Sequence, residues 1–211
     1  MSTATNHGPT PGNVTLWASV VHEHDMISTR LLGFWLYMLS DSLIFAALFT
    51  AYEVLSYHSA LAGGPGPGDV AQPLHAYFET IVLLTSVLAF GLAMVALKRN
   101  QPRVLFGWLV LSALIGLGFL GMEWSDLARL VQQGDGPQRS GYLSIFFALI
   151  GVHAMHIAIG LLWMAVMLVQ MTRNGLSVLV VYRMANLKIF WLYQALIWTF
   201  VFTFVYLRGS I

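Results

Sequence analysis

The candidates for chemistry in this chain are five acids and histidines in or beside its long apolar stretches, chosen by their residue types and spacing. They are Asp41, Glu79, Glu123, His153 and His156. A charge at the centre of a membrane-spanning helix costs about 2.5 to 3.5 kcal/mol even on a lenient insertion scale, so such groups mark candidate functional sites. Acids and imidazoles at this depth are suited to proton handling, to metal ligation or to hydrogen bonds between helices.

Asp41 lies eleven residues after Arg30, where the first apolar stretch begins. At ~1.5 Å per helical residue, it is expected about 16 Å into the membrane, near the midplane. Ser40 and Ser42 flank it and are candidate hydrogen-bond partners. The spacing leaves two interpretations with equal weight: a proton-handling carboxylate, or a protonated, hydrogen-bonded acid that holds helices together.

His153 and His156 lie three residues apart near the centre of the fourth apolar stretch, so they project from one face of a helix. Haem axial ligands approach the iron from opposite sides, which these neighbours cannot do together. The other histidines, at positions 7, 22, 24, 58 and 75, fall in tails or loops. We therefore expect no haem, metal or other cofactor in this chain, and favour a polar interhelical contact for the pair over a metal ligand.

Glu79 and Glu123 fall at the ends of the second and third apolar stretches, where interfacial water is within reach. A proton path could use them. A structural role at a helix end is the favoured interpretation.

The composition identifies the environment in which these groups act. The chain has 211 residues, of which 58% are hydrophobic and only 9% charged, a balance typical of membrane proteins. Its ten basic residues are not clustered, which argues against nucleic acid as a partner, and the absence of cysteine excludes disulfides and thiolate metal sites.

Five apolar stretches are long enough to cross the bilayer as helices, which need about 20 residues. They cover residues 31–55, 77–97, 104–122, 143–171 and 189–207. Since lipid offers the backbone no hydrogen-bond partner, these segments must be helical. The sequence therefore predicts an all-α, polytopic membrane bundle of five transmembrane helices at residues 30–211. Residues 1–29 are polar and are expected to form a flexible cytoplasmic tail.

The basic residues predict an orientation through the positive-inside bias. With a cytoplasmic N-terminus, seven of the ten Lys and Arg residues lie inside and three, Arg129, Arg139 and Arg208, lie outside. We therefore expect the C-terminus and the Gly/Pro-rich loop at residues 62–68 on the periplasmic side.

Several strings along residues 30–207 resemble subunit III of bacterial bo-type ubiquinol oxidases, in the haem–copper oxidase family. They are RLLGFWLYMLSD at 30–41, GGP at 63–65, FET at 78–80, GFLGME at 118–123 and GPQRSGYLSIFFALIGVHAMH at 136–156. The five-span count fits this version better than the seven-span subunit III of typical cytochrome c oxidases.

The resemblance implies a non-catalytic subunit of a proton-pumping quinol oxidase in the bacterial inner membrane. Haem and copper would then belong to the partner catalytic subunit I, and this chain would support stability, bind phospholipid and assist proton uptake. Asp41 matches the family's buried acid after a serine, and Glu79, Glu123, His153 and His156 match its other recurring polar positions.

One departure from the family pattern lies in the last span. Leu192 and Ala195 stand where the family usually has His and Asp, which raises the alternative of a subunit III-like protein of a cytochrome c oxidase or a nitric oxide reductase. The rival from a different class is an autonomous membrane transporter or channel with a path past Asp41 and His153.

Overall fold

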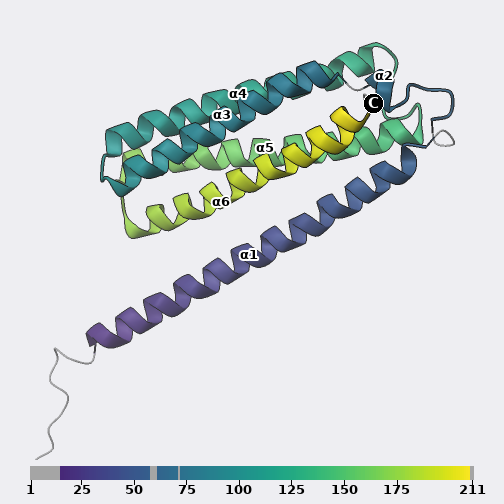
Figure 1. Cartoon of the computed structure of the whole chain (residues 1–211). Coiled ribbons are helices and arrows are strands. Elements are labelled where there is room, and N and C mark those ends of the chain that lie inside the picture. The colour runs from purple at the N-terminus through teal and green to yellow at the C-terminus, as the bar shows by residue number, and fades with distance from the viewer. Residues whose placement is uncertain (1–14, 58–60, 71, 210–211) are drawn as a thin grey trace, which may run out of the picture. The chain divides into compact units, whose positions relative to one another are not determined.

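The regular structure is entirely helical in the residues that the computed structural model describes, which are 15–57, 61–70 and 72–209, with side chains from residue 32 onward except at 174 and 178. The helices are α1 (Thr15–Leu55), α2 (Pro67–Val70), α3 (Pro73–Lys98), α4 (Pro102–Gln132), α5 (Gly141–Asn174), α6 (Val178–Val201) and the π-helical η2 (Phe202–Leu207). Five helical segments are long and apolar enough to span a membrane. The predicted all-α class and five spans are confirmed (Figure 1).

The helices extend beyond the spans that hydropathy predicts, so several predicted ends were wrong. α3 begins at Pro73 instead of residue 77, and α4 runs from Pro102 to Gln132 instead of 104–122. Proline at the first helical position has the required φ and lacks only an N–H that has no helical partner there. Hydropathy detects the lipid-facing part of a helix, whereas the backbone hydrogen bonds continue through the interface. α1 likewise begins upstream of residue 31, and residues 1–14 of the predicted tail lie outside the described ranges.

The last two long helices also differ from their predicted limits. α5 covers 141–174 instead of 143–171, and α6 begins at 178 instead of 189. Ser140 and Ser177 cap their N-termini, with side chains that accept from the backbone N–H of Leu143 and Val180. Arg183 and Lys188 interrupt the apolar run but not the helix, which is why the pattern placed the last start too late.

The chain divides into two units within α1, between Ser42 and Leu43. In the first unit, the Ser42 hydroxyl donates to the backbone carbonyl of Met38 at 2.8 Å. The second unit holds the remainder of α1 and all of the later helices.

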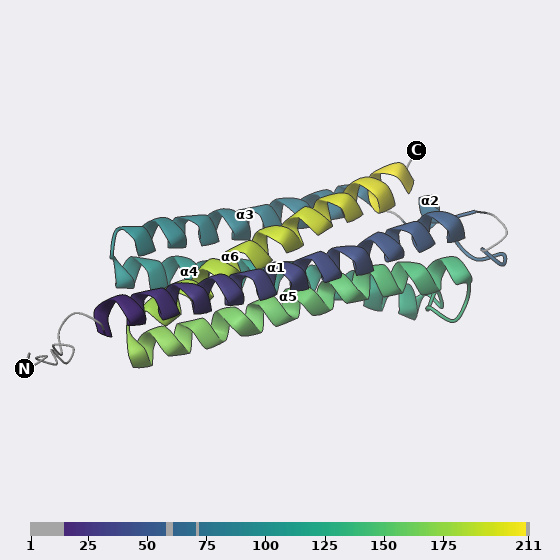
Figure 2. The same ribbon diagram turned by 90° about the horizontal axis from the view of Figure 1, so that it is seen from below.

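Within the second unit, α3 to α6 form a closed four-helix arrangement. α3 packs on α4, α4 on α5, α5 on α6 and α6 on α3, as Figures 1 and 2 both show. Short connections such as residues 99–101 make sequence neighbours antiparallel. The starts of α3 and α5, the end of α4 and η2 therefore lie at one end of this bundle.

The centre of the bundle is organised around Trp191, which is 1% exposed. Its indole N–H donates to the Ser86 hydroxyl at 3.2 Å. Ser86 and Ser112 each donate to the other's backbone carbonyl at 2.9 Å, so α3, α4 and α6 share one polar contact. Gly116 and Gly160 leave room for the indole: a Cβ built on either would come within 2.9 and 2.8 Å of it, respectively. These two close approaches explain why glycine occupies both positions.

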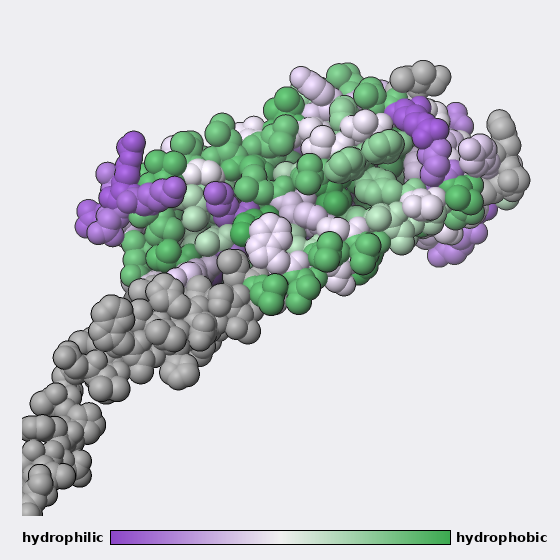
Figure 3. Space-filling view, turned by 60° about the horizontal axis from the view of Figure 1, so that its bottom comes forward, coloured by the Kyte–Doolittle hydropathy of each residue, from purple (hydrophilic) through white to green (hydrophobic). Residues whose placement is uncertain are grey.

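The outer surface of the helices is apolar. Figure 3 shows one face on which hydrophobic side chains lie between hydrophilic groups at the two ends. Exposed leucines follow α3 and α4, among them Leu84, Leu88, Leu92, Leu111, Leu114 and Leu117. An apolar exterior along helices of this length fits acyl chains and not water.

Candidate functional site

A buried histidine–carboxyl pair joins three helices. His153 of α5 is 0% exposed and Glu123 of α4 is 2% exposed. The His153 Nδ1 atom lies 3.2 Å from Glu123 Oε1, and its Nε2 lies 3.3 Å from the backbone carbonyl oxygen of Gln194 in α6. Phe119 and Trp198 pack against the imidazole, with ring centroids at 5.8 and 5.1 Å. The sequence-predicted His153 and Glu123 are thus brought together.

The hydrogen-bond geometry limits the protonation states of this pair. A carbonyl oxygen only accepts, so His153 Nε2 carries hydrogen and donates to Gln194. One proton then lies between Nδ1 and Oε1, either on the imidazole or on the carboxyl group. The arrangement can therefore hold and transfer a single proton between two named atoms inside the bundle.

A second group of titratable side chains lies closer to the end of the bundle. His75 and Glu79, four residues apart on α3, face Asp126 of α4. The His75 Nε2 atom is 3.4 Å from Asp126 Oδ1 and 3.7 Å from Glu79 Oε1. Arg129 Nη2 approaches Asp126 Oδ1 at 3.9 Å. Glu79 is 1% exposed, so it lies inside the packed bundle and not at an open helix end.

A small cavity lies between the two groups. It has a volume of about 10 Å³ and is lined in part by Glu123, Asp126, Arg129 and Tyr206. That volume corresponds to about one water molecule, and the polar lining supplies the hydrogen-bond partners that a buried water needs. The cavity makes Glu123 and Asp126 parts of one polar region.

The other two predicted residues are His156 and Asp41. The His156 Nδ1 atom donates to the backbone carbonyl of Val152 on its own helix at 2.7 Å, and its ring stacks on Phe190 with centroids at 6.4 Å. His153 and His156 therefore have different environments although they share a helix. Asp41 lies in the first unit and is described with that unit alone.

Sequence reasoning missed His75, Asp126 and Gln194. The sequence prediction puts His75 in a loop because the predicted span begins two residues later, whereas the helix starts at Pro73. The spacing of four between His75 and Glu79 and of three between Glu123 and Asp126 would have placed each pair on one helical face. The carbonyl of Gln194 has no sequence signal because every residue carries one.

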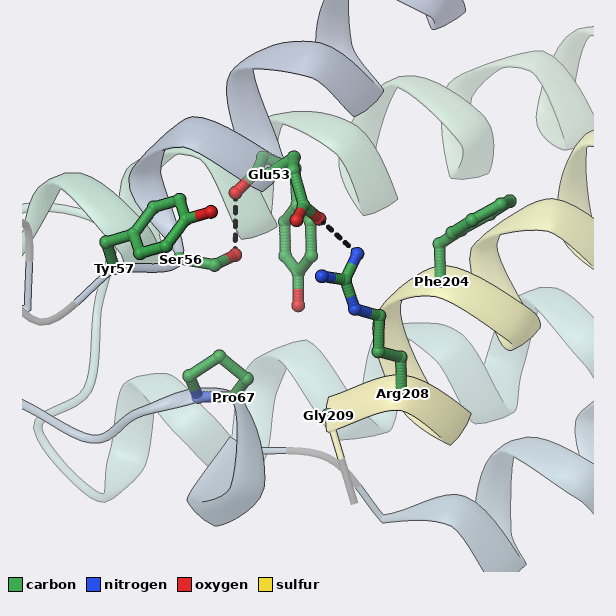
Figure 4. A pocket seen from close by; sticks show the side chains of 8 residues that line it. Glu53, Ser56, Tyr57, Pro67, Phe204, Arg208 and Gly209 are labelled. Carbon is green, nitrogen blue, oxygen red and sulfur yellow. Dashed lines mark hydrogen bonds and ion pairs between the residues drawn. The ribbon is translucent and has the colours of Figure 1, made fainter. Parts of the chain in front are cut away.

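A polar pocket lies between the second half of α1 and the chain's C-terminal end. Figure 4 shows Glu53 and Arg208 directed toward each other across it, and the Arg208 guanidinium donates to Glu53 Oε2 at 2.7 Å. The pocket has a volume of about 170 Å³. An adjoining groove of about 500 Å³ is mainly apolar and is lined by Phe49, Phe200 and Phe204 among others.

The structure also gives the environment of the two departures from the family pattern. Leu192 is 45% exposed and Ala195 is 5% exposed on α6. Leu192 thus adds to the apolar exterior, whereas Ala195 is packed in the interior.

Comparison with known proteins agrees with this arrangement. Residues 16–210 match the sequence profile of the family described as cytochrome c oxidase subunit III. The chain is 43% identical to cytochrome bo(3) ubiquinol oxidase subunit 3 of Pseudomonas putida, over 88% of this chain and 89% of the relative. It is 39% identical to the Pseudomonas aeruginosa protein of the same name, over 90% of both chains. It is 31% identical to cytochrome c oxidase subunit 3 of Bacillus sp. (strain PS3), over 86% of this chain and 87% of the relative.

Members of this family are non-catalytic subunits of haem–copper oxidases and carry no catalytic metal. The match covers nearly the whole chain, and five apolar helices fit a multi-pass protein of the inner membrane. The chain therefore belongs to the cytochrome c oxidase subunit III family, as a non-catalytic member of a hetero-oligomeric oxidase.

Proposed function

We propose that the chain is subunit III of a proton-translocating oxidase that uses ubiquinol as its electron donor, with haem and copper in a partner catalytic subunit. The observation that carries this proposal is identity: two Pseudomonas relatives named as ubiquinol oxidase subunits are 43 and 39% identical to it, whereas the Bacillus cytochrome c oxidase subunit is 31% identical. The engagement of both His153 ring nitrogens by protein groups fits a chain that leaves redox centres to its partner.

Purification from the native membrane in mild detergent tests the proposal. An affinity tag on this chain is expected to retain a larger, haem-containing subunit, and the complex should consume oxygen with ubiquinol and not with reduced cytochrome c. A colourless homo-oligomer would contradict the oxidase assignment. Oxygen consumption driven by reduced cytochrome c alone would contradict the assigned donor.

The pocket and groove beside η2 support phospholipid binding as a part of this role. The apolar groove lined by Phe49 and Phe204 suits an acyl chain, and the polar pocket at its end presents both charges of the Glu53–Arg208 pair to a headgroup. A zwitterionic headgroup can meet both charges. Arg208→Leu should reduce the phospholipid that copurifies with the complex, whereas Arg183→Leu, which removes an exposed arginine on α6, should not. Equal lipid content in both variants would contradict this assignment.

Orientation and proton handling complete the proposal. The excess of basic residues favours a cytoplasmic N-terminus, and in that orientation α2, η2 and the pocket would face the periplasm. Asp41 is assigned a proton-linked role because it is an acid deep in a predicted span and matches a recurring family position. Protease protection of tags placed at the two ends of the chain, measured in sealed vesicles, tests the orientation.

A further inference from the structure

The cluster at the start of α3 has the dimensions of a metal site. The ligand atoms offered by His75, Glu79 and Asp126 all lie within 4.8 Å of one another. A tetrahedral zinc ion with bonds of about 2.0 to 2.1 Å holds its ligand atoms about 3.3 Å apart. The observed separations of 3.4 Å to Asp126 and 3.7 Å to Glu79, both measured from His75 Nε2, approach that spacing.

An independent observation comes from the buried carboxyl groups. Glu79 is 1% exposed, and neither of its carboxyl oxygens has a hydrogen-bond partner among the described residues. The Oε2 atom of the nearby Glu123 is also buried without a hydrogen-bond partner among the described residues. Buried polar atoms in native proteins are nearly always satisfied by protein, water or an ion. The Glu79 side chain is directed at His75 Nε2, so an ion placed between them would satisfy it.

The charge of the region also favours a cation. Two carboxyl groups, those of Glu79 and Asp126, lie at the site with one guanidinium, that of Arg129. The nearby Glu123 shares one proton with His153, so that pair adds no net charge. Among the described residues, the ion pair of Arg129 is with Asp126, at 3.9 Å, so the Glu79 carboxyl group has no guanidinium beside it. A divalent ion would compensate the excess of negative charge that remains.

The site is accessible from one side. The His75 side chain is 37% exposed and that of Asp126 is 19% exposed, whereas Glu79 lies beneath them. An ion can therefore enter past the imidazole and complete its coordination with water. One nitrogen and two carboxylate oxygens with an open fourth position form a ligand set that zinc accepts.

We propose that His75, Glu79 and Asp126 form a zinc-binding site with water as the fourth ligand. The site is independent of electron transfer and fixes the start of α3 to the end of α4. Arg129 lowers the affinity of the site because its positive charge lies beside one ligand.

The test is zinc stoichiometry in the intact purified oxidase. The complex is treated with a chelator, incubated with zinc chloride at graded concentrations, desalted and analysed by mass spectrometry of the metal content. His75→Gln and Asp126→Asn should each bind one zinc ion fewer per complex than the wild type. The control is Asp135→Asn, which removes an acid that pairs with Arg139 outside the cluster and should keep the wild-type count.

Two further measurements make the result decisive. X-ray absorption at the zinc edge of the wild type should show nitrogen and oxygen ligands at about 2.0 to 2.1 Å without sulfur. Arg129→Gln should bind the same ion severalfold more tightly. If Asp126→Asn fails to assemble, His75→Gln decides alone, since it changes a partly exposed side chain. Zinc counts equal to the wild type in an assembled His75→Gln complex would overturn the proposal and leave a cluster that holds water and protons only.

Discussion

Gly160→Ala is expected to destabilise the bundle through a single methyl group. The new Cβ would lie 2.8 Å from Cζ3 and 2.9 Å from Cε3 of Trp191, and 3.1 Å from Cε1 of Phe190. Carbon atoms in good contact are about 3.5 to 4.0 Å apart, so the indole must move by roughly 0.6 to 1.2 Å.

The indole has no room for this movement. Gly116 on α4 would place a Cβ 2.9 Å from Cζ2 of Trp191, so the ring is already in close contact with two helices. Overpacking of this kind costs about 1 to 3 kcal/mol. Displacement also strains the hydrogen bond from Trp191 to Ser86, and interhelical bonds in membranes contribute about 0.6 kcal/mol on average. We therefore expect Gly160→Ala to reduce stability by about 2 to 3 kcal/mol, the upper half of the range for overpacking.

The assay is the temperature at which this chain dissociates from the purified complex in detergent. Gly151→Ala is the matched control on the same helix, because its Cβ meets no atom of the described residues within 4 Å. Trp191→Phe in the Gly160→Ala background should recover part of the loss, since a smaller ring makes room for the methyl group. Equal dissociation temperatures for Gly160→Ala and Gly151→Ala would refute the packing argument.

Substitutions at three further residues test the polar contacts. Glu123→Gln should lower the free energy of unfolding by less than about 1 kcal/mol, because an amide can still hydrogen-bond His153. Glu123→Ala should lower it by about 2 to 4 kcal/mol, because it leaves a buried nitrogen unpaired beside a cavity. Chemical unfolding compares the two variants, and equal losses would exclude this explanation. Asp41→Asn should leave assembly and haem content intact but slow proton uptake or shorten the enzyme's lifetime during turnover. Ser40→Ala is the control. If Asp41→Asn leaves the rate of proton uptake and the lifetime unchanged, the proton-linked assignment is wrong. Ser140→Ala should reduce stability by about 1 kcal/mol because it removes the hydroxyl that accepts from the backbone N–H of Leu143. The loss is measured as a lower dissociation temperature. An unchanged temperature would show that this cap does not stabilise the helix.

The five spans were predictable because lipid imposes both a length and a helical backbone on apolar segments. The ends of the helices were harder to predict. Pro73 and Ser177 mark true helix starts, but each lies in a polar stretch that hydropathy excludes. Local capping chemistry determines where a helix begins, and the bilayer determines only the part of it that must be apolar.

The candidate site was predicted residue by residue but not as an arrangement. Depth in an apolar stretch identified His153 and Glu123 separately, and their contact depends on how α4 and α5 are aligned, which no local pattern gives. Asp126 escaped notice because it follows the end of the predicted span. The two histidines of α5 show the same limit: they share a helical face, yet His153 contacts Glu123 on α4 whereas His156 donates to Val152 on its own helix.

The π-helical η2 segment has a consequence for related sequences. A π-helical turn contains one residue more than an α-helical turn, and such turns are accommodated within a longer helix. Removing one residue between Phe202 and Leu207 would therefore restore a continuous α-helix while Arg208 kept its direction toward Glu53. Homologous chains that are one residue shorter in this segment should keep the same contacts before and after the missing residue. A one-residue gap at this point of an alignment therefore marks a change from π- to α-helical winding and leaves the packing unchanged.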